Sequence, residues 1–225
     1  MLEDAVPHAE LRRALVVKLR HHGDVLLATP VFSALKAAAP QLEIDALVYD
    51  DTAPMLEGHP AIDRVHTVGR QWRAAGLGRL AGEWRLYRDL GSRDYDLVVH
   101  LSEHPRGAWL ARTLGARYAV APGYADRSRF WKRSFTHRFA LPLNGRRHMV
   151  EWNLDALRRI GVQPADGVRG LVFIPGAPAD ARAQALLAEH GLRAREFVHL
   201  HPASRWSFKC WPAERFGELA RRLIH

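Results

Sequence analysis

The sequence predicts an α/β protein with a parallel sheet that is covered by helices on both faces. Two observations lead to this prediction. Short, mainly apolar runs such as Ala14–Leu19 are typical of strands that are buried on both faces. These runs alternate with segments whose apolar residues recur every three or four positions, as in amphipathic helices. This alternation favours a parallel sheet, whose ligands bind beyond the carboxyl ends of the strands.

The individual elements follow from the same patterns. We expect strands at 14–19, 42–48, 65–68, 96–101 and 118–121. We expect helices at 24–39, 51–58, 72–90, 107–114 and 148–160. The helix at 72–90 rests on the spacing of Trp72, Leu77, Leu80, Trp84 and Tyr87, and Gly161 stops the last helix. The stretch 122–147 has no such period, so we expect it to be irregular and basic.

A second unit is predicted after a linker. At roughly 150 residues per domain, 225 residues make about one and a half domains. Residues 1–160 form the first domain in this interpretation, and Gly161–Gly170 is the linker because it is rich in turn-forming residues. Residues 171–225 begin an incomplete second domain, with strands at 171–174 and 197–201 and helices at 178–189 and 212–224.

Composition excludes several classes of protein. Apolar residues make up 48% and charged residues 25%, which is close to the average of globular proteins and unlike a disordered or collagen-like chain. No apolar run approaches the ~18 residues of a membrane-spanning helix. The single cysteine, Cys210, excludes a disulfide framework. The N-terminus has early acidic residues and no apolar core of a secretory signal, so we expect a cytoplasmic protein.

The positive charge is concentrated in one stretch. The chain has a net charge of +9, and residues 101–150 carry ten Lys and Arg against two Asp and Glu. Nine of these ten cations are arginines, whose planar guanidinium groups bind phosphate in a bidentate way. A local field of this kind suits a phosphate, a nucleic acid or an acidic membrane surface. An ordinary solvated basic face is the alternative.

The first candidate motif follows the first predicted strand. The segment 18–25, with the sequence KLRHHGDV, passes from a strand through Gly23 into a helix that begins near Asp24. Asp24 fits the N-cap of this helix. It also fits a carboxylate at the ligand-binding edge of the sheet, where it could take a proton from a hydroxyl group as a general base. His21 and His22 lack the further ligands that a metal site needs.

The second candidate motif follows a strand in the second unit. The segment 199–212, with the sequence HLHPASRWSFKCWP, again passes from a strand through a polar loop into a helix. Ser204 and Lys209 would supply a hydroxyl and an ammonium group to a diphosphate at the start of that helix. The alternative is an ordinary loop that is anchored by its aromatic residues. The sequence contains no Gly-x-Gly-x-x-Gly fingerprint, Walker A loop, zinc-ligand pattern or Gly-x-Ser-x-Gly elbow.

These two motifs resemble those of a known family. The runs 16–36 (VVKLRHHGDVLLATPVFSALK) and 201–212 resemble the opening and the donor-domain entry of the lipopolysaccharide heptosyltransferases of glycosyltransferase family 9. The segments 95–107 and 148–154 fit the same pattern. The resemblance covers about residues 12–225, and the 204–211 segment is most similar to the third inner-core heptosyltransferases.

The resemblance implies a GT-B fold, in which two Rossmann-like domains bind acceptor and donor. It implies an inverting, metal-independent transfer of L-glycero-D-manno-heptose from ADP-heptose to the phosphorylated inner core of lipopolysaccharide. Asp24 would be the general base, and Gly23, Ser204 and Lys209 would bind the donor. Acceptor binding would fall to Arg106, Arg127, Arg129 and His148. The enzyme would be cytoplasmic and peripheral to the inner membrane of a Gram-negative bacterium.

One departure from the family pattern lies at the C-terminus. Family members continue with a segment that holds the nucleotide, and this chain ends at His225. We therefore expect the chain to be truncated in its donor domain, and to bind ADP-heptose poorly and turn over little by itself. A family 9 transferase with another sugar or acceptor is one alternative. A non-catalytic basic module is another, although no RNA-stacking motif or helix-turn-helix supports nucleic acid as its partner.

Overall fold

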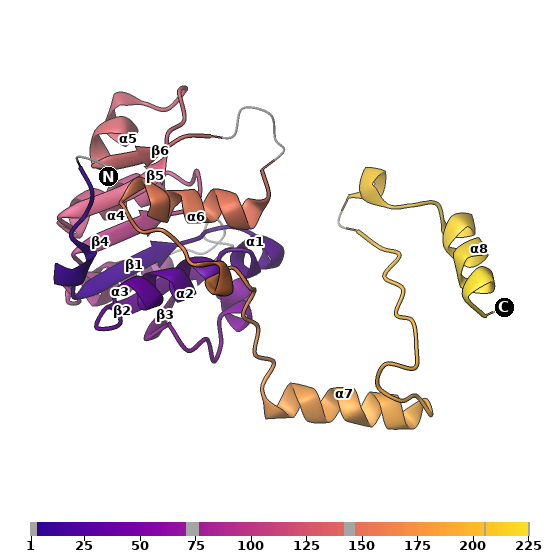
Figure 1. Cartoon of the computed structure of the whole chain (residues 1–225). Helices are drawn as coiled ribbons and strands as arrows, with labels where there is room; N and C mark the ends of the chain where they lie inside the picture. Colours follow the sequence, from indigo (N-terminus) through magenta and orange to yellow (C-terminus); the bar gives the residue numbers. More distant parts are fainter. Residues whose placement is uncertain (1–3, 71–76, 142–146, 205, 225) are drawn as a thin grey trace. The chain divides into compact units, whose positions relative to one another are not determined.

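The computed structural model describes residues 4–70, 77–141, 147–204 and 206–224 of the chain (Figure 1). These residues form two compact units, Met1–Gly176 and Ala177–His225, and each is described by itself. The first domain at 1–160 and the linker at 161–170 remain predictions.

The first unit is built on a parallel sheet of six strands in the order β3-β2-β1-β4-β5-β6. The strands are β1 (Arg13–Val17), β2 (Glu43–Tyr49), β3 (Arg64–Val68), β4 (Leu97–His100), β5 (Tyr118–Pro122) and β6 (His137–Phe139). The strand order reverses between β1 and β4, which pair directly in the middle of the sheet. The loops that follow these two strands therefore diverge and leave a crevice at the carboxyl edge, where sheets of this kind bind ligands.

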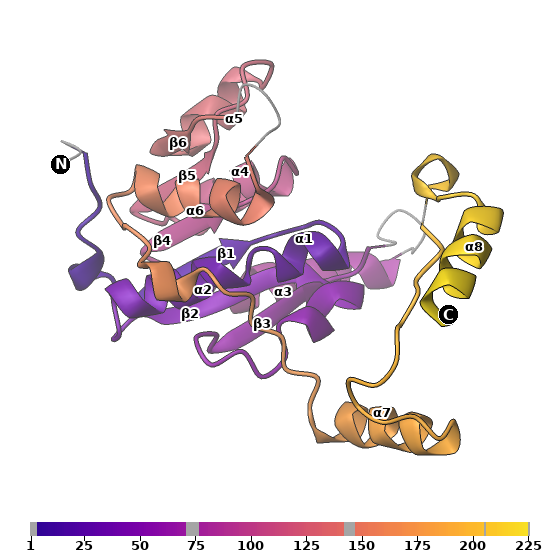
Figure 2. The same ribbon diagram turned by 45° about the vertical axis from the view of Figure 1, so that its right-hand side comes forward.

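Helices cover both faces of this sheet. They are α1 (His22–Leu26), α2 (Thr29–Ala38), α3 (Leu77–Gly91), α4 (Arg106–Thr113), α5 (Arg129–Ser134) and α6 (Met149–Arg159). Apolar side chains of α2 and α6 fill the core on one face, where Figure 2 shows both helices in front of the strands. Apolar side chains of α3, α4 and α5 fill the core on the other face.

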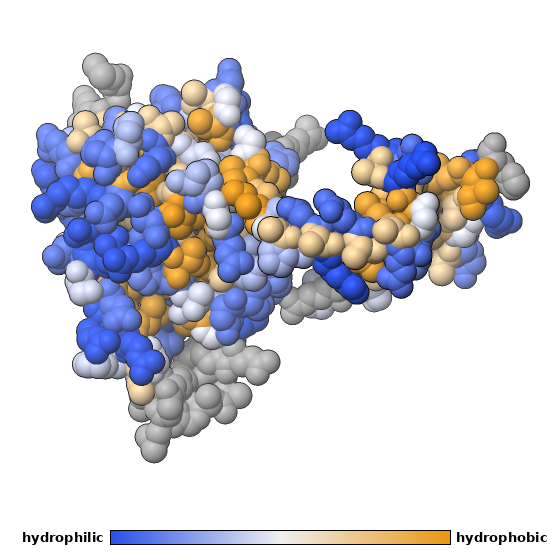
Figure 3. Space-filling model, turned by 90° about the horizontal axis from the view of Figure 1, so that it is seen from below, coloured by the Kyte–Doolittle hydropathy of each residue, from blue (hydrophilic) through white to orange (hydrophobic). Residues whose placement is uncertain are grey.

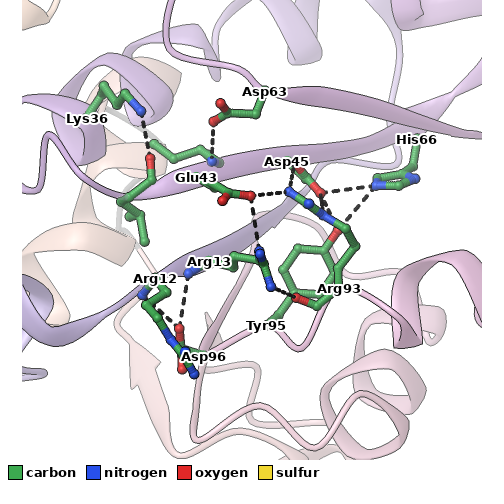
Figure 4. A network of polar contacts seen from close by, with 12 residues as sticks. Arg12, Arg13, Lys36, Glu43, Asp45, Asp63, His66, Arg93, Tyr95 and Asp96 are labelled. Carbon is green, nitrogen blue, oxygen red and sulfur yellow. Dashed lines mark hydrogen bonds and ion pairs between the residues drawn. The ribbon is translucent and has the colours of Figure 1, made fainter.

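A buried polar network ties together the amino ends of the strands (Figure 4). Asp45 on β2 is fully buried and accepts hydrogen bonds from the Arg93 guanidinium at 2.9 and 3.3 Å and from the Tyr95 hydroxyl at 2.6 Å. His66 on β3 lies 3.3 Å from the same carboxylate. Glu43 joins Arg93 to Arg13 on β1. The network thus cross-links β1, β2, β3 and the loop before β4.

Two segments of the first unit differ from the sequence prediction. The expected helix at 24–39 is divided into α1 and α2, because Pro30 has no amide hydrogen and fits only a first helical turn. The Thr29 hydroxyl donates to the Leu26 carbonyl at the junction. The expected irregular stretch 122–147 contains α5 and β6. These elements are too short to show a period. Trp131 of α5 and Phe139 of β6 are buried, as is Phe135 between them.

Other boundaries shift by small amounts. The expected helix at 51–58 is a 3-10 helix over Asp50–Met55, and α3 covers the described part of the expected helix at 72–90. Residues 71–76 lie outside the described ranges. Two further 3-10 turns cover His8–Glu10 and Asp166–Val168, the latter inside the predicted linker.

The second unit contains helices α7 (Ala177–Glu189) and α8 (Ala213–Ile224), with a 3-10 turn at Ser207–Lys209. The predictions of strands at 171–174 and 197–201 are wrong. The first segment belongs to the first unit and the other to the second, and neither has a hydrogen-bonded strand partner in the described residues. An apolar run becomes a strand only when another strand pairs with it. Hydrophobic side chains lie exposed along the second unit, whereas hydrophilic residues cover most of the visible face of the first (Figure 3).

Candidate functional site

The carboxyl edge of the sheet holds a pocket of about 340 Å³ between the loops that follow β1 and β4. Its walls come mainly from the segment from the end of β1 into α1, the residues after β4 and the first turns of α6, and one residue after each of β5 and β6 completes them. The lining residues are Lys18, Arg20, Asp24, Leu101, Ser102, Glu103, Tyr124, Leu141, Arg147, Met149 and Trp152. The pocket therefore combines one catalytic candidate, Asp24, with several cationic side chains.

Asp24 occupies the third position of α1 rather than its N-cap. His21 is the N-cap, and the Asp24 carboxylate accepts the His21 backbone N–H at 3.3 Å, which makes Asp24 the reciprocal half of a capping box. The second carboxylate oxygen accepts no hydrogen bond from the described residues. The capping role thus uses one oxygen and leaves the other available to a hydroxyl group in the pocket.

Lys18 lies at the base of this pocket and is 2% exposed. Its ammonium group donates to the Leu101 carbonyl at 2.9 Å and to Asn153 Oδ1 on α6 at 3.0 Å. Asn153 in turn donates to the Leu27 carbonyl, next to α1, at 2.9 Å. This chain of hydrogen bonds joins β1, β4, α6 and α1, and so fixes the segment that carries Asp24. Burial lowers the pKa of Lys18 to about 8, although the charge of Asp24 opposes the shift.

We predict that one lysine titrates near pH 8. The chain contains four lysines, so ¹³Cε NMR of the labelled protein resolves them individually. One resonance should have a midpoint near 8, and the Lys18→Arg variant should lack it. Replacing Asn153 with Leu should move the midpoint lower, because the ammonium form loses an acceptor. If every lysine resonance has its midpoint near the ordinary value of 10.5, burial does not control the pKa of Lys18.

The lowered pKa of Lys18 makes the free energy of unfolding depend on pH. Between the folded pKa of about 8 and the ordinary value of 10.5, the unfolded chain binds more protons than the folded chain at Lys18. The contribution of Lys18 to the free energy of unfolding therefore rises with pH across that window. Below that pH window, the buried charge of Lys18 lowers the free energy of unfolding.

A second, more basic pocket of about 320 Å³ adjoins the first. The two pockets share Arg20 and Glu103. Arg70, which follows β3, and Arg127 also line it. Glu103 pairs with Arg20 at 3.1 Å and with Arg127 at 3.5 Å, and Arg70 pairs with Asp51 at 2.8 Å. Three arginines and one carboxylate, Glu103, line this pocket, which makes it suited to an anionic group.

The predicted acceptor residues lie in different places. Arg127 lines the basic pocket. Arg106 is turned instead toward Glu83 on α3, with which it forms a bidentate ion pair at 2.5 and 2.8 Å. Arg129 is exposed at the start of α5, and His148 caps α6 by accepting the Val150 N–H. Sequence analysis missed Arg20 and Arg70 as candidates, although Arg20 directly follows one predicted strand and Arg70 is the second residue after another.

The predicted donor residues are divided between the two units. Gly23 lies on α1 in the first unit, and an added Cβ would meet no other atom within 4 Å. Ser204 and Lys209 lie in the second unit. The Ser204 N–H donates to Cys210 Sγ at 3.2 Å, which closes the loop on itself. Lys209 Nζ lies 5.9 Å from the centre of the Phe208 ring.

Comparison with known proteins decides the family. The sequence profile of glycosyltransferase family 9 (heptosyltransferase) matches residues 83–225, more than half of the chain. The chain belongs to glycosyltransferase family 9. It is 35% identical over 200 residues to lipopolysaccharide heptosyltransferase 3 of Escherichia coli, covering 88% of this chain and 57% of that protein. It is 32% identical over 221 residues to lipopolysaccharide heptosyltransferase 1 of Pseudomonas aeruginosa, covering 94% and 58%.

Solved structures of the family share the fold. The glycosyl transferase family 9 protein of Veillonella parvula matches with a TM-score of 0.79 at 24% identity, over 98% of this chain and 61% of that one. The E. coli heptosyltransferase WaaC, solved with ADP-2-deoxy-2-fluoro heptose, matches with a TM-score of 0.65 at 22% identity, over 94% and 65%. The predicted α/β fold class of GT-B type is therefore confirmed.

Two further observations bear on this family 9 chain. It spans a little over half the length of the curated relatives that it matches. Within the described residues, no three His, Cys, Asp or Glu side chains cluster as metal ligands would, and no helix is long and apolar enough to cross a bilayer.

Proposed function

We propose that this chain provides the acceptor half and the start of the donor half of an inverting heptosyltransferase of lipopolysaccharide core synthesis. The observation that supports it most is the position of Asp24 in the pocket at the carboxyl edge of the sheet. The proposed donor is ADP-L-glycero-D-manno-heptose. One relative is named lipopolysaccharide heptosyltransferase 3, and one related structure was solved with ADP-2-deoxy-2-fluoro heptose.

In this mechanism Asp24 acts as the general base. The free carboxylate oxygen removes the proton of an acceptor hydroxyl while the hydroxyl oxygen attacks the anomeric carbon of the heptose. The bond from that carbon to the diphosphate oxygen breaks, and ADP leaves with the electron pair. Attack opposite the leaving group inverts the anomeric centre. A positioned base of this kind contributes typically 10²–10⁴-fold to the rate.

The acceptor and donor are proposed to meet different parts of the chain. The basic pocket with Arg20, Arg70 and Arg127 would bind phosphate or carboxylate groups of the core oligosaccharide. Arg129 and His148 remain candidates for its outer part. Gly23, Ser204 and Lys209 would hold the donor diphosphate and stabilise the negative charge on ADP, without a metal ion. The protein would be cytoplasmic and peripheral to the inner membrane.

A transfer assay tests the proposal. A chimaera would continue residues 1–225 with the remaining C-terminal part of the E. coli heptosyltransferase 3. We expect the chimaera to transfer heptose from ADP-heptose to a phosphorylated inner-core oligosaccharide. We expect the chain alone to bind that oligosaccharide in calorimetry but to give little or no turnover.

Two outcomes would favour the alternatives. Transfer of a different sugar would indicate another family 9 reaction. A chimaera that binds no core oligosaccharide but binds DNA or RNA tightly at physiological salt would indicate a basic binding module. Contacts between cationic side chains and backbone phosphates dominate binding of that kind.

A further inference from the structure

Three large aromatic side chains lie exposed on neighbouring helices of the first unit. Trp84 on α3 is 65% exposed, Trp109 on α4 is 56% exposed, and Phe130 on α5 is 37% exposed. The core-facing positions of the same helices are filled by other residues, such as Leu90, Leu110 and Trp131. The three exposed rings are therefore not needed to fill the core.

Two of these rings are in contact, and the third lines a hollow that reaches the helix of Trp109. The centres of the Trp109 and Phe130 rings are 4.7 Å apart. Trp84 and Thr113 line the same hollow of about 360 Å³ between α3 and the end of α4. The Thr113 hydroxyl donates to the Trp109 carbonyl, so the hollow lies one helical turn from the Trp109 ring.

Arginines lie among the rings. The Arg88 guanidinium is 5.1 Å from the centre of the Trp84 ring, and that of Arg112 is 5.3 Å from the centre of the Phe130 ring. Arg129, next to Phe130, is exposed. Of the nearby carboxylates, Asp89 pairs with Arg88, and Asp126 lines the hollow between α4 and α5. We call Trp84, Arg88, Trp109, Arg112, Arg129 and Phe130 the aromatic–arginine face.

This face leads to the basic pocket. A hollow of about 210 Å³ between α4 and α5 is lined by Trp109 and Phe130 and also by Pro105 and Arg127. Pro105 and Arg127 line the basic pocket as well. A molecule held at the face thus lies next to the site proposed for the anionic acceptor.

We propose that the aromatic–arginine face docks on an anionic phospholipid bilayer and so presents the basic pocket to a membrane-anchored acceptor. Trp and Phe rings partition into the interfacial region of a bilayer, and arginines bind its anionic headgroups. The excess of arginine around the rings favours an anionic bilayer over a neutral apolar partner. The role in presenting the acceptor rests on the proposed function, but the bilayer contact does not.

The test is binding of the 225-residue protein to phospholipid vesicles, measured by co-sedimentation without acceptor or donor. We expect binding to phosphatidylcholine vesicles that contain phosphatidylglycerol, weaker binding to pure phosphatidylcholine, and a loss of binding as salt is raised. The triple variant Arg88→Gln, Arg112→Gln and Arg129→Gln should bind about 100-fold more weakly, since each arginine near the surface contributes about fivefold. A Trp84→Ser, Trp109→Ser and Phe130→Ser variant should also lose binding.

Matched controls separate this face from the rest of the chain. Exposed Arg12 and Arg64 lie on other parts of the first unit, and exposed Trp211 lies in the second unit. An Arg12→Gln and Arg64→Gln variant and a Trp211→Ser variant should bind as the parent does, and thermal unfolding should show that every variant folds. The proposal would be overturned if the control variants lost as much vesicle binding as the variants of the aromatic–arginine face. It would also be overturned if the parent bound neutral vesicles as tightly as anionic ones. Vesicle binding by the 225-residue protein, together with no heptose transfer by the chimaera, would leave it intact and reject only the proposed function.

Discussion

Replacing Asp24 with Asn in the chimaera should lower the rate of heptose transfer by about 10²- to 10⁴-fold. The carboxamide oxygen of Asn can still accept the His21 N–H at the start of α1, so the capping box survives. The carboxamide cannot accept the proton of the acceptor hydroxyl. We therefore expect kcat to fall while the affinity for the core oligosaccharide changes little.

The Asp24→Ala variant separates the role of Asp24 as a general base from its role in capping α1. It should lose transfer to the same extent and also lower the free energy of unfolding by about 0.5–1.5 kcal/mol, because the hydrogen bond from the His21 N–H is lost. Asn should cost much less stability than Ala. If the Asn variant transfers heptose at the parental rate, Asp24 is a capping residue only, and another base must serve the reaction.

The sequence predicts the sheet better than the segments that decorate it. Four of the six strands were expected because they are mainly apolar runs buried on both faces, and burial of that kind leaves a direct mark on composition. β3 was expected too, although most of its residues are exposed. β6 has three residues, and α5 depends on its Ser128 cap and the buried Trp131. Such short elements gain their stability from tertiary contacts, which no local period shows.

The candidate site, like the fold, could be predicted only in part from the sequence. The rule that ligands meet the carboxyl ends of strands predicts a site near Asp24, and Asp24 lines a pocket at that edge of the sheet. The family resemblance placed Arg106 among the acceptor residues, and the structure pairs it with Glu83, which belongs to a different helix. Lys18 sits within an apolar run, and only the fold brings it to Asn153, far along the chain. Long-range ion pairs and hydrogen bonds of this kind cannot be predicted from local patterns.

The largest expected loss of stability comes from Asp45 at the opposite edge of the sheet. Removing its carboxylate by Asp45→Ala should lower the free energy of unfolding by about 3–5 kcal/mol, because the partly buried Arg93 and the Tyr95 hydroxyl lose their principal acceptor. Urea denaturation measures the difference. Asp166→Ala is the control: its carboxylate is 95% exposed and pairs with Arg169, so its loss should cost less than about 1 kcal/mol.

The same carboxylate predicts a response to acid. Burial raises the pKa of Asp45, but hydrogen bonds from His66, Tyr95 and Arg93 outweigh burial and hold it below its ordinary value. A lowered folded pKa stabilises the protein at neutral pH, and this contribution is lost as pH falls through the ordinary value near 3.8 toward the folded pKa. Asp45→Asn cannot titrate, so its unfolding free energy should fall less steeply with acid than that of the parent. Parallel pH profiles would contradict this assignment.

Asp45 should matter to stability and not to ligand binding. Its network lies at the amino ends of the strands, with Arg13 and Glu43 at the first residues of β1 and β2. Lys18, Arg20 and Asp24 follow the carboxyl end of β1. At a temperature where the Asp45→Asn variant remains folded, its affinity for the core oligosaccharide should therefore equal that of the parent. A drop in affinity there would mean that the amino-end network also shapes the pocket, through the strands that join the two edges.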